Sequence, residues 1–148
     1  MKRHTRYQGA IVQDGKLLII SHRRHDNGHE YWVLPGGGIE SGETEHECVV
    51  REMQEETGLQ VRVERLLLQK PDIAPAAIYQ QINTYLCTPI GGVASPGYEP
   101  EIEASAVYSI HAVRWISLAD ESDWDQAVKQ DVVTYPQLQD IRAALGYA

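Results

Sequence analysis

The chain has 148 residues, of which 43% are hydrophobic, and a formal net charge of −8. This length predicts a single domain, residues 1–148, that is large enough to bury a core of its own. The negative charge argues against a nucleic-acid polymer as the main partner, because a phosphate backbone requires a basic protein surface.

Cysteine usage and hydropathy predict the compartment. The two cysteines, Cys48 and Cys87, are too few for a disulfide framework and form no C-x-x-C pair, so we expect reduced thiols in a cytoplasmic protein. The N-terminus lacks the apolar run of a signal peptide. The uncharged stretch 73–98 contains three prolines and several polar residues, which excludes a membrane span. We expect a monomer or a homodimer with no membrane partner.

The first elements expected are the two strands of a β-hairpin. Apolar runs at 7–13 and 16–22 flank the turn dipeptide Asp14-Gly15. The second strand leads into a polar loop, a common place for ligand contacts, which begins with Arg23 and Arg24. Either arginine could contact a phosphate of a substrate, and a solvated loop charge is an equally good interpretation.

A short strand at 31–34 follows and runs into three consecutive glycines at 36–38. Trp32 in this strand could stack on a base of a bound nucleotide, although packing in the core is the commoner role of such a side chain. The glycines permit a close approach of the backbone to a ligand.

A helix is predicted between Thr44 and Gly58. Thr44 and Glu47 have the spacing of a capping box, and Gly58 fits a left-handed C-terminal cap, so the helix has about 13 residues. At about 100° per residue, the helix has an acidic face and an apolar face that should meet the core. The acidic face comprises Glu45, Glu52, Glu55 and Glu56, and the apolar face comprises Val49, Val50 and Met53.

Three of these acids lie at spacings i, i+3 and i+4, where like charges destabilise an isolated helix. A Mg²⁺ or Mn²⁺ ion would offset the repulsion, because both ions prefer carboxylate oxygens. Arg51 could in addition hold one carboxylate through a bidentate pair. Taken alone, the pattern E-x-x-E-E is more often a solvated acidic face.

The full stretch from Gly37 to Leu59 changes that balance. Its nine specified positions match G-x5-E-x7-R-E-U-x-E-E-x-G-U, where U is aliphatic. From average residue usage, a chance match has a probability of about one in ten million or less. The stretch is the Nudix box, so the chain resembles the Nudix hydrolases, and it also has the W-x-L-P-G-G sequence usual before the box.

The resemblance implies the function of individual residues. Glu52, Glu55 and Glu56 match the metal-binding acids of the family, and Arg51 matches the arginine that orients them. The carbonyl of the residue matching Gly37 often helps to bind the metal. The catalytic base differs among family members, so a box glutamate, with Glu52 first, and an acid from a later loop both stay open.

The rest of the chain predicts further strands at 60–69, 78–88 and 107–116. The loop 89–103 is rich in glycine and proline and is the expected substrate-contacting segment. It contains the acids Glu99, Glu101 and Glu103, of which Glu101 is central and is our candidate catalytic acid.

A helix at 117–133 and a last helix should complete the chain. The last helix should open with a second capping box at 134–137 and end at Gly146. This order of elements predicts an α+β fold with a mixed sheet. The resemblance implies the Nudix α/β/α sandwich.

The activity implied is hydrolysis, dependent on Mg²⁺ or Mn²⁺, of the pyrophosphate linkage in a nucleoside diphosphate joined to another group. A nucleoside triphosphate, an ADP-ribose-like compound and a nucleotide sugar are all compatible with the sequence. Pro75 lies 16 positions after the box, as in some ADP-ribose hydrolases of the family, but one proline does not select among these substrates. A nucleotide-binding regulator without turnover is the alternative.

Overall fold

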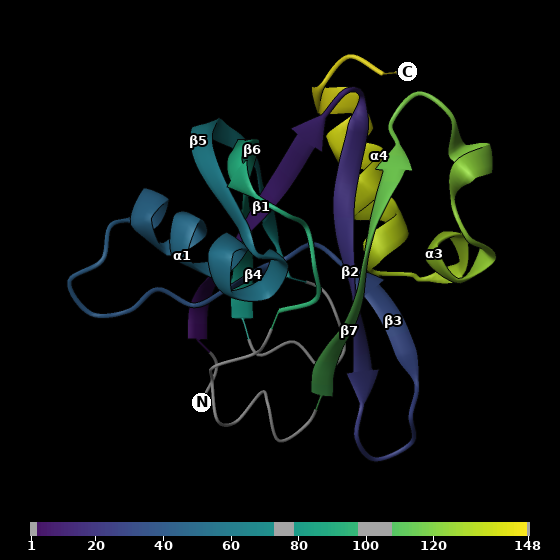
Figure 1. The fold of residues 1–148 in the computed structure, drawn as a ribbon, viewed down its shortest axis with the longest axis horizontal. Coiled ribbons are helices and arrows are strands. Elements are labelled where there is room, and N and C mark those ends of the chain that lie inside the picture. Colours follow the sequence, from purple (N-terminus) through teal and green to yellow (C-terminus); the bar gives the residue numbers. More distant parts are fainter. Residues whose placement is uncertain (1–2, 73–78, 98–107, 148) are drawn as a thin grey trace.

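The structure, a computed structural model, describes residues 3–72, 79–97 and 108–147 (Figure 1). Its strands are β1 (Arg3–Gln13), β2 (Lys16–Arg24), β3 (Glu30–Val33), β4 (Gly36–Gly37), β5 (Leu59–Pro71), β6 (Tyr79–Gly92) and β7 (Tyr108–Ser117). Its helices are α1 (Glu45–Thr57), the 3-10 helix η1 (Glu121–Asp123), α3 (Gln126–Gln130) and α4 (Thr134–Ala144). None of the helices in these described ranges is long and apolar enough to cross a membrane.

The strands form one mixed sheet in the order β3-β2-β1-β6-β5, with β4 beside β1 and β7 beside β2. β1 and β6 are parallel, and the other pairs are antiparallel. The β1–β2 hairpin turns at Asp14 (φ 53°) and Gly15 (φ 73°), as a tight turn with two positive φ angles requires. The predicted α+β fold with a mixed sheet is confirmed.

Both faces of the sheet are covered. Ile11 on β1 and Leu18 on β2 belong to the buried cluster beneath α1, whereas their neighbours Ala10 and Leu17 belong to the buried cluster beneath α4 (Figure 1). Successive side chains of a strand point to opposite faces, so a run buried at every position must lie between two layers. The hydrophobic run of β2 therefore produces the α/β/α sandwich.

The exposure of Val50 and the end of β6 differ from expectation. Val50, placed on the core face of α1 from the sequence, is 39% exposed, because the core side of the helix is filled by Cys48, Val49 and Met53. Strand β6 continues through Pro89, where a loop was expected. Proline is tolerated there because β6 pairs with β1 only as far as Cys87 and afterwards with β5 alone.

The single helix expected at 117–133 is wrong; the structure has η1 and α3 instead. Side chains compete for the backbone here: Asp120 accepts from the Ser122 N–H, and Asp123 accepts from the Ser117 N–H. Trp124 is buried and donates its indole N–H to the Ser117 carbonyl at 2.7 Å. These contacts hold the chain in turns before α3.

The last helix begins at Thr134, as expected, but the predicted capping box is wrong. Thr134 donates its hydroxyl to the Trp32 carbonyl at 2.6 Å and does not cap the helix. Asp131 supplies the cap, because its Oδ1 accepts from the N–H groups of Val133 and Thr134, both at 2.9 Å. Gly146, with φ +85°, follows the end of the helix.

Candidate active site

Helix α1 begins and ends as its sequence predicts. Thr44 and Glu47 form both bonds of the capping box, and Gly58 is left-handed with φ 76°. Its N-terminal turn is attached to the sheet, because the Tyr85 hydroxyl on β6 donates to Glu45 Oε1 at 2.6 Å. Glu45 was expected on the face of the box carboxylates, but its carboxylate accepts the hydrogen bond from Tyr85.

Glu52 and Glu56 are buried against the two glycines of β4. The Gly36 N–H donates to Glu56 Oε1 at 2.7 Å, and Glu56 is 0% exposed. A β-carbon on residue 37 would lie 2.4 Å from Glu52 Oε1 and 2.6 Å from its carboxyl carbon. Gly37 therefore allows the backbone of β4 to lie directly on the Glu52 carboxylate.

Arg51 connects α1 to the segment that precedes it. Its guanidinium binds Glu43 in a bidentate manner, at 2.7 Å and 2.9 Å, and donates to the Gly38 carbonyl at 3.0 Å. Its Nη1 donates to both Glu52 Oε1, at 3.0 Å, and Glu55 Oε2, at 3.2 Å. One cation thus offsets the repulsion among three carboxylates.

Ion pairing and burial shift the pKa values of several groups in and near α1. The hydrogen bonds from Arg51 lower the pKa of Glu43 below its usual value, and the same contact raises the pKa of Arg51. Burial raises the pKa of the Cys48 and Cys87 thiols to about 12, so both stay protonated at neutral pH. Both cysteines are free thiols, as expected, and both are buried.

The donors available here fit a hard divalent cation. Glu52, Glu55 and Glu56 offer carboxylate oxygens, and Gly37 offers a backbone carbonyl, which are the ligand types that Mg²⁺ and Mn²⁺ prefer. Within the described parts of the chain, no three His, Cys, Asp or Glu side chains are gathered closely enough to hold a metal as they stand. Two of the carboxylates converge on Arg51 instead.

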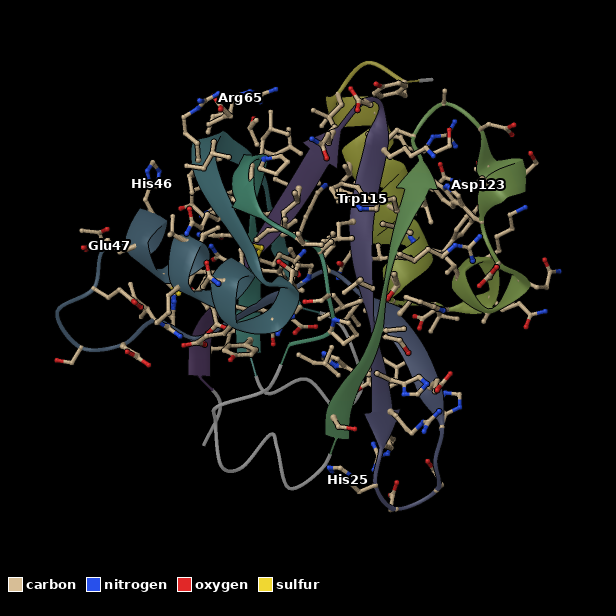
Figure 2. The ribbon with its side chains drawn as sticks, viewed as in Figure 1. His25, His46, Glu47, Arg65, Trp115 and Asp123 are labelled. Carbon is tan, nitrogen blue, oxygen red and sulfur yellow. The ribbon has the colours of Figure 1, made fainter. Side chains whose placement is uncertain are left out.

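The residues expected to contact substrate have other partners in the structure. Arg23 is paired with Glu30, and Arg24 is paired with Asp26 at 2.8 Å in the β2–β3 hairpin. Figure 2 shows His25, next to Arg24, at the tip of this hairpin, away from Glu47 at the start of α1.

Trp32 is half-buried and packs against the core cluster beneath α4. The described contacts of the two arginines and of Trp32 are thus with residues other than the box carboxylates, and their contact with substrate stays a prediction. Glu101, its neighbours Glu99 and Glu103, and Pro75 lie outside the described residues.

A pocket that the sequence did not indicate lies on the other face of the sheet, between α4 and strands β1, β5 and β6. Its volume is about 190 Å³. Gln8 Nε2 donates to Thr84 Oγ1 at 2.8 Å and to Gln137 Oε1 at 3.3 Å, and the surrounding walls include Ile82 and Pro136. These polar residues come from three distant parts of the chain and belong to no motif, so no local sequence signal indicates them.

The pocket and the carboxylates are joined through β1 and β4. Gln8, whose side chain lines the pocket, pairs with Gly36 in the sheet. Gly36 in turn donates its N–H to Glu56. The pocket, whose lining is mostly apolar, and the carboxylate cluster thus adjoin the same pair of strands.

Comparison with known proteins defines the family. The NUDIX domain family matches residues 3–136, and the chain therefore belongs to the Nudix hydrolase family.

Three relatives illustrate the range of that family. The chain is 32% identical over 127 residues to a MutT-like protein of Streptomyces ambofaciens, covering 76% of this chain and 74% of that protein. It is 40% identical over 91 residues to an ADP-ribose pyrophosphatase of Methanocaldococcus jannaschii, covering 60% of this chain and 53% of that protein. It is 33% identical over 90 residues to the NAD-capped RNA hydrolase NudC of Photobacterium profundum, covering 61% of this chain but only 32% of that protein.

Solved structures share the fold. A NUDIX hydrolase from Nitrosomonas europaea superposes with a TM-score of 0.71 at 21% identity, over 96% of this chain and 90% of that one. A MutT NUDIX hydrolase from Burkholderia pseudomallei superposes with a TM-score of 0.66 at 25% identity, over 95% of this chain and 99% of that one. The α/β/α arrangement is thus the Nudix fold.

Proposed function

We propose that this chain hydrolyses the pyrophosphate linkage of a nucleoside diphosphate joined to another group, with Mg²⁺ or Mn²⁺. The observation that carries the proposal is the buried cluster of box carboxylates, held by Arg51 and lying on the glycines of β4. Buried carboxylates are expensive to keep charged unless they are paired or bind a cation. A bound cation would polarise a phosphoryl oxygen and lower the pKa of water.

Each residue of the cluster has a proposed role. Glu52, Glu55, Glu56 and the Gly37 carbonyl hold the cation. Arg51 holds Glu52 and Glu55 side by side before the cation binds, and binding of the cation redirects their oxygens from Arg51 to the metal. Glu52 or Glu101 positions or deprotonates the attacking water. If Glu101 is that base, Glu101→Gln lowers kcat by about a hundredfold, whereas a solvated charge leaves kcat within about twofold.

We propose that the pocket lined by Gln8, Thr84 and Gln137 receives the base of the substrate. Two carboxamides and a hydroxyl supply donors and acceptors, and the apolar walls suit an aromatic ring. Its volume of about 190 Å³ is below the usual range for whole-ligand pockets, about 300–1,000 Å³. A single ring system fits that size better than a complete nucleotide.

ADP-linked compounds are the first substrates to test. Two of the relatives are named for ADP-ribose and for NAD-capped RNA, and both names describe an adenosine diphosphate linked to another group. The second name also bears on the expectation that no nucleic-acid polymer is a partner, which stays a prediction. A short panel of candidate substrates, with ADP-linked compounds first, is therefore enough to test the choice of substrate.

The test is a hydrolysis screen with Mg²⁺ or Mn²⁺ on ADP-ribose, NADH, nucleotide sugars, nucleoside triphosphates and NAD-capped RNA. Glu56→Gln serves as the control against a contaminating hydrolase. For any substrate that is turned over, Gln137→Leu should raise KM and leave kcat nearly unchanged, because the pocket contacts the base and not the reacting phosphorus.

Two results would contradict the proposal. Absence of turnover on the whole panel by a folded, metal-supplied chain would favour the regulator alternative. Equal KM values for Gln137→Leu and the unmodified chain would show that the base of the substrate does not bind in this pocket.

A further inference from the structure

Residues 93–97, which follow β6 and which we call the strap, cover the C-terminal end of α1. Figure 1 shows this green coil leaving β6 and passing the end of the helix. The Ser95 N–H donates to the Thr57 carbonyl at 2.9 Å, and the Gly97 N–H donates to the Glu56 carbonyl at 3.0 Å. The last carbonyls of a helix have no partner within it, so the strap supplies partners that the helix lacks.

The contact is so close that it depends on glycine. A β-carbon on residue 97 would lie 1.9 Å from the Glu55 carbonyl oxygen and 2.7 Å from the Glu56 carbonyl carbon. These are backbone atoms and cannot rotate away as a side chain could. A β-carbon on Gly58 would likewise meet the strap, at 2.9 Å from the Val93 carbonyl oxygen.

The turn that the strap holds carries Glu55 and Glu56. Glu56 is fully buried, and its Oε1 is fixed by the Gly36 N–H at 2.7 Å. Glu55 Oε2 is fixed by Arg51 at 3.2 Å. A shift of the backbone at these two residues therefore moves both carboxylates relative to β4.

We propose that the strap is a positioning element for the Glu55–Glu56 carboxylate pair, and that Gly97 is the residue on which this positioning depends. The inference rests on the proposed function for its consequence in catalysis. Its geometric part, which is the placement of Glu56 against Gly36, holds with or without a cation. Gly97 touches neither substrate nor metal and acts through the backbone of α1.

The test compares Gly97→Ala with Gly91→Ala. Gly91 lies just before the strap, and a β-carbon there would meet first the flexible end of Gln60, at 2.8 Å. The Gly36 amide resonance, measured by nuclear magnetic resonance without metal, should move in Gly97→Ala and stay in place in Gly91→Ala. Binding of Mn²⁺, measured by calorimetry, should weaken about tenfold or more in Gly97→Ala and by less than about twofold in Gly91→Ala.

Kinetics separates positioning from general destabilisation. With any substrate found in the screen, Gly97→Ala should lower kcat while KM changes little, because the carboxylates act on the reacting phosphate. A Gly97→Ala chain with lower thermal stability but an unmoved Gly36 resonance and normal Mn²⁺ affinity would overturn the inference. If only the proposed function is wrong, the result is different. The unmodified chain then binds no Mn²⁺, but the Gly36 resonance still moves in Gly97→Ala.

If Gly97→Ala does not fold, hydrogen exchange in the unmodified chain tests the inference. If the strap changes how well the carboxylates bind a cation, a bound cation must stabilise the strap by the same free energy, because coupling between two sites is reciprocal. Saturating Mg²⁺ should slow hydrogen exchange at the Ser95 and Gly97 amides. In a chain that calorimetry shows to bind Mg²⁺, exchange at these amides that is the same with and without Mg²⁺ would overturn the inference.

Discussion

Replacing Arg51 by lysine is the most direct test of how the carboxylate cluster is held. The guanidinium makes five nitrogen–oxygen hydrogen bonds, to Glu43, Gly38, Glu52 and Glu55. A lysine ammonium keeps the charge, but its three donors lie on one atom and cannot reproduce the planar fork. At least two of the five bonds must therefore be lost.

The expected cost follows from those bonds. A hydrogen bond to a charged group contributes about 1.5–3 kcal/mol net. The Arg51 side chain is 20% exposed, so solvent screens it in part and the lower figure applies. Two lost bonds give a decrease of about 3 kcal/mol in the free energy of unfolding for Arg51→Lys.

Equilibrium unfolding in urea, with EDTA present to remove metals, measures this decrease. Arg24→Lys is the matched control, because Arg24 binds Asp26 through the same two-bond geometry at 3.0 Å and 2.8 Å but on the exposed hairpin. Its free energy of unfolding should be unchanged within error. A double-mutant cycle of Arg51→Lys with Glu43→Gln should give a coupling energy of about 1 kcal/mol or more.

The reasoning fails if Arg51→Lys changes the free energy of unfolding by less than about 0.5 kcal/mol, the usual effect of a surface substitution. It fails equally if the effects at positions 51 and 43 simply add. Either result would mean that the guanidinium fork does not organise the segment before α1.

Two further predictions concern Glu56 and His22. Glu56→Gln keeps an acceptor for the Gly36 N–H but removes a buried charge, so the chain should stay folded. Mn²⁺ affinity, measured by calorimetry, and turnover, measured by kinetics, should both fall about tenfold or more. Unchanged values of both would show that Glu56 is not a metal ligand. Burial lowers the pKa of His22 from 6.5 to about 3, so the unfolded chain takes up a proton that the folded chain does not, and stability is lost as the pH falls below about 6.5. Between about pH 7.5 and 5.5 the free energy of unfolding should fall by about 1.4 kcal/mol for this reason. In urea unfolding, the free energy of unfolding of His22→Leu should therefore change with pH by that much less than in the unmodified chain. The same change in both proteins would contradict the burial argument.

The parts of the fold that follow from local sequence were predicted well. The capping box at Thr44 and the left-handed Gly58 define α1 residue by residue, because both depend on side chains or dihedral angles within a few positions. The Asp14-Gly15 turn is equally local. The helix at 117–133 failed because Trp124, anchored to the core, overrides the local preference for helix.

The sequence alone identified the Nudix box and, through it, the family and the candidate carboxylates, because these lie on one helix whose spacing fixes their relative directions. Only the tertiary structure assigned Arg51 its bidentate partner Glu43, laid β4 on Glu52, brought Gln8 and Gln137 together and placed Gly97 against the end of α1. Each of these contacts joins elements brought together by the folding of the sheet between two helical layers. These contacts depend on packing across the whole domain, so the spacing of residues along the chain does not predict them.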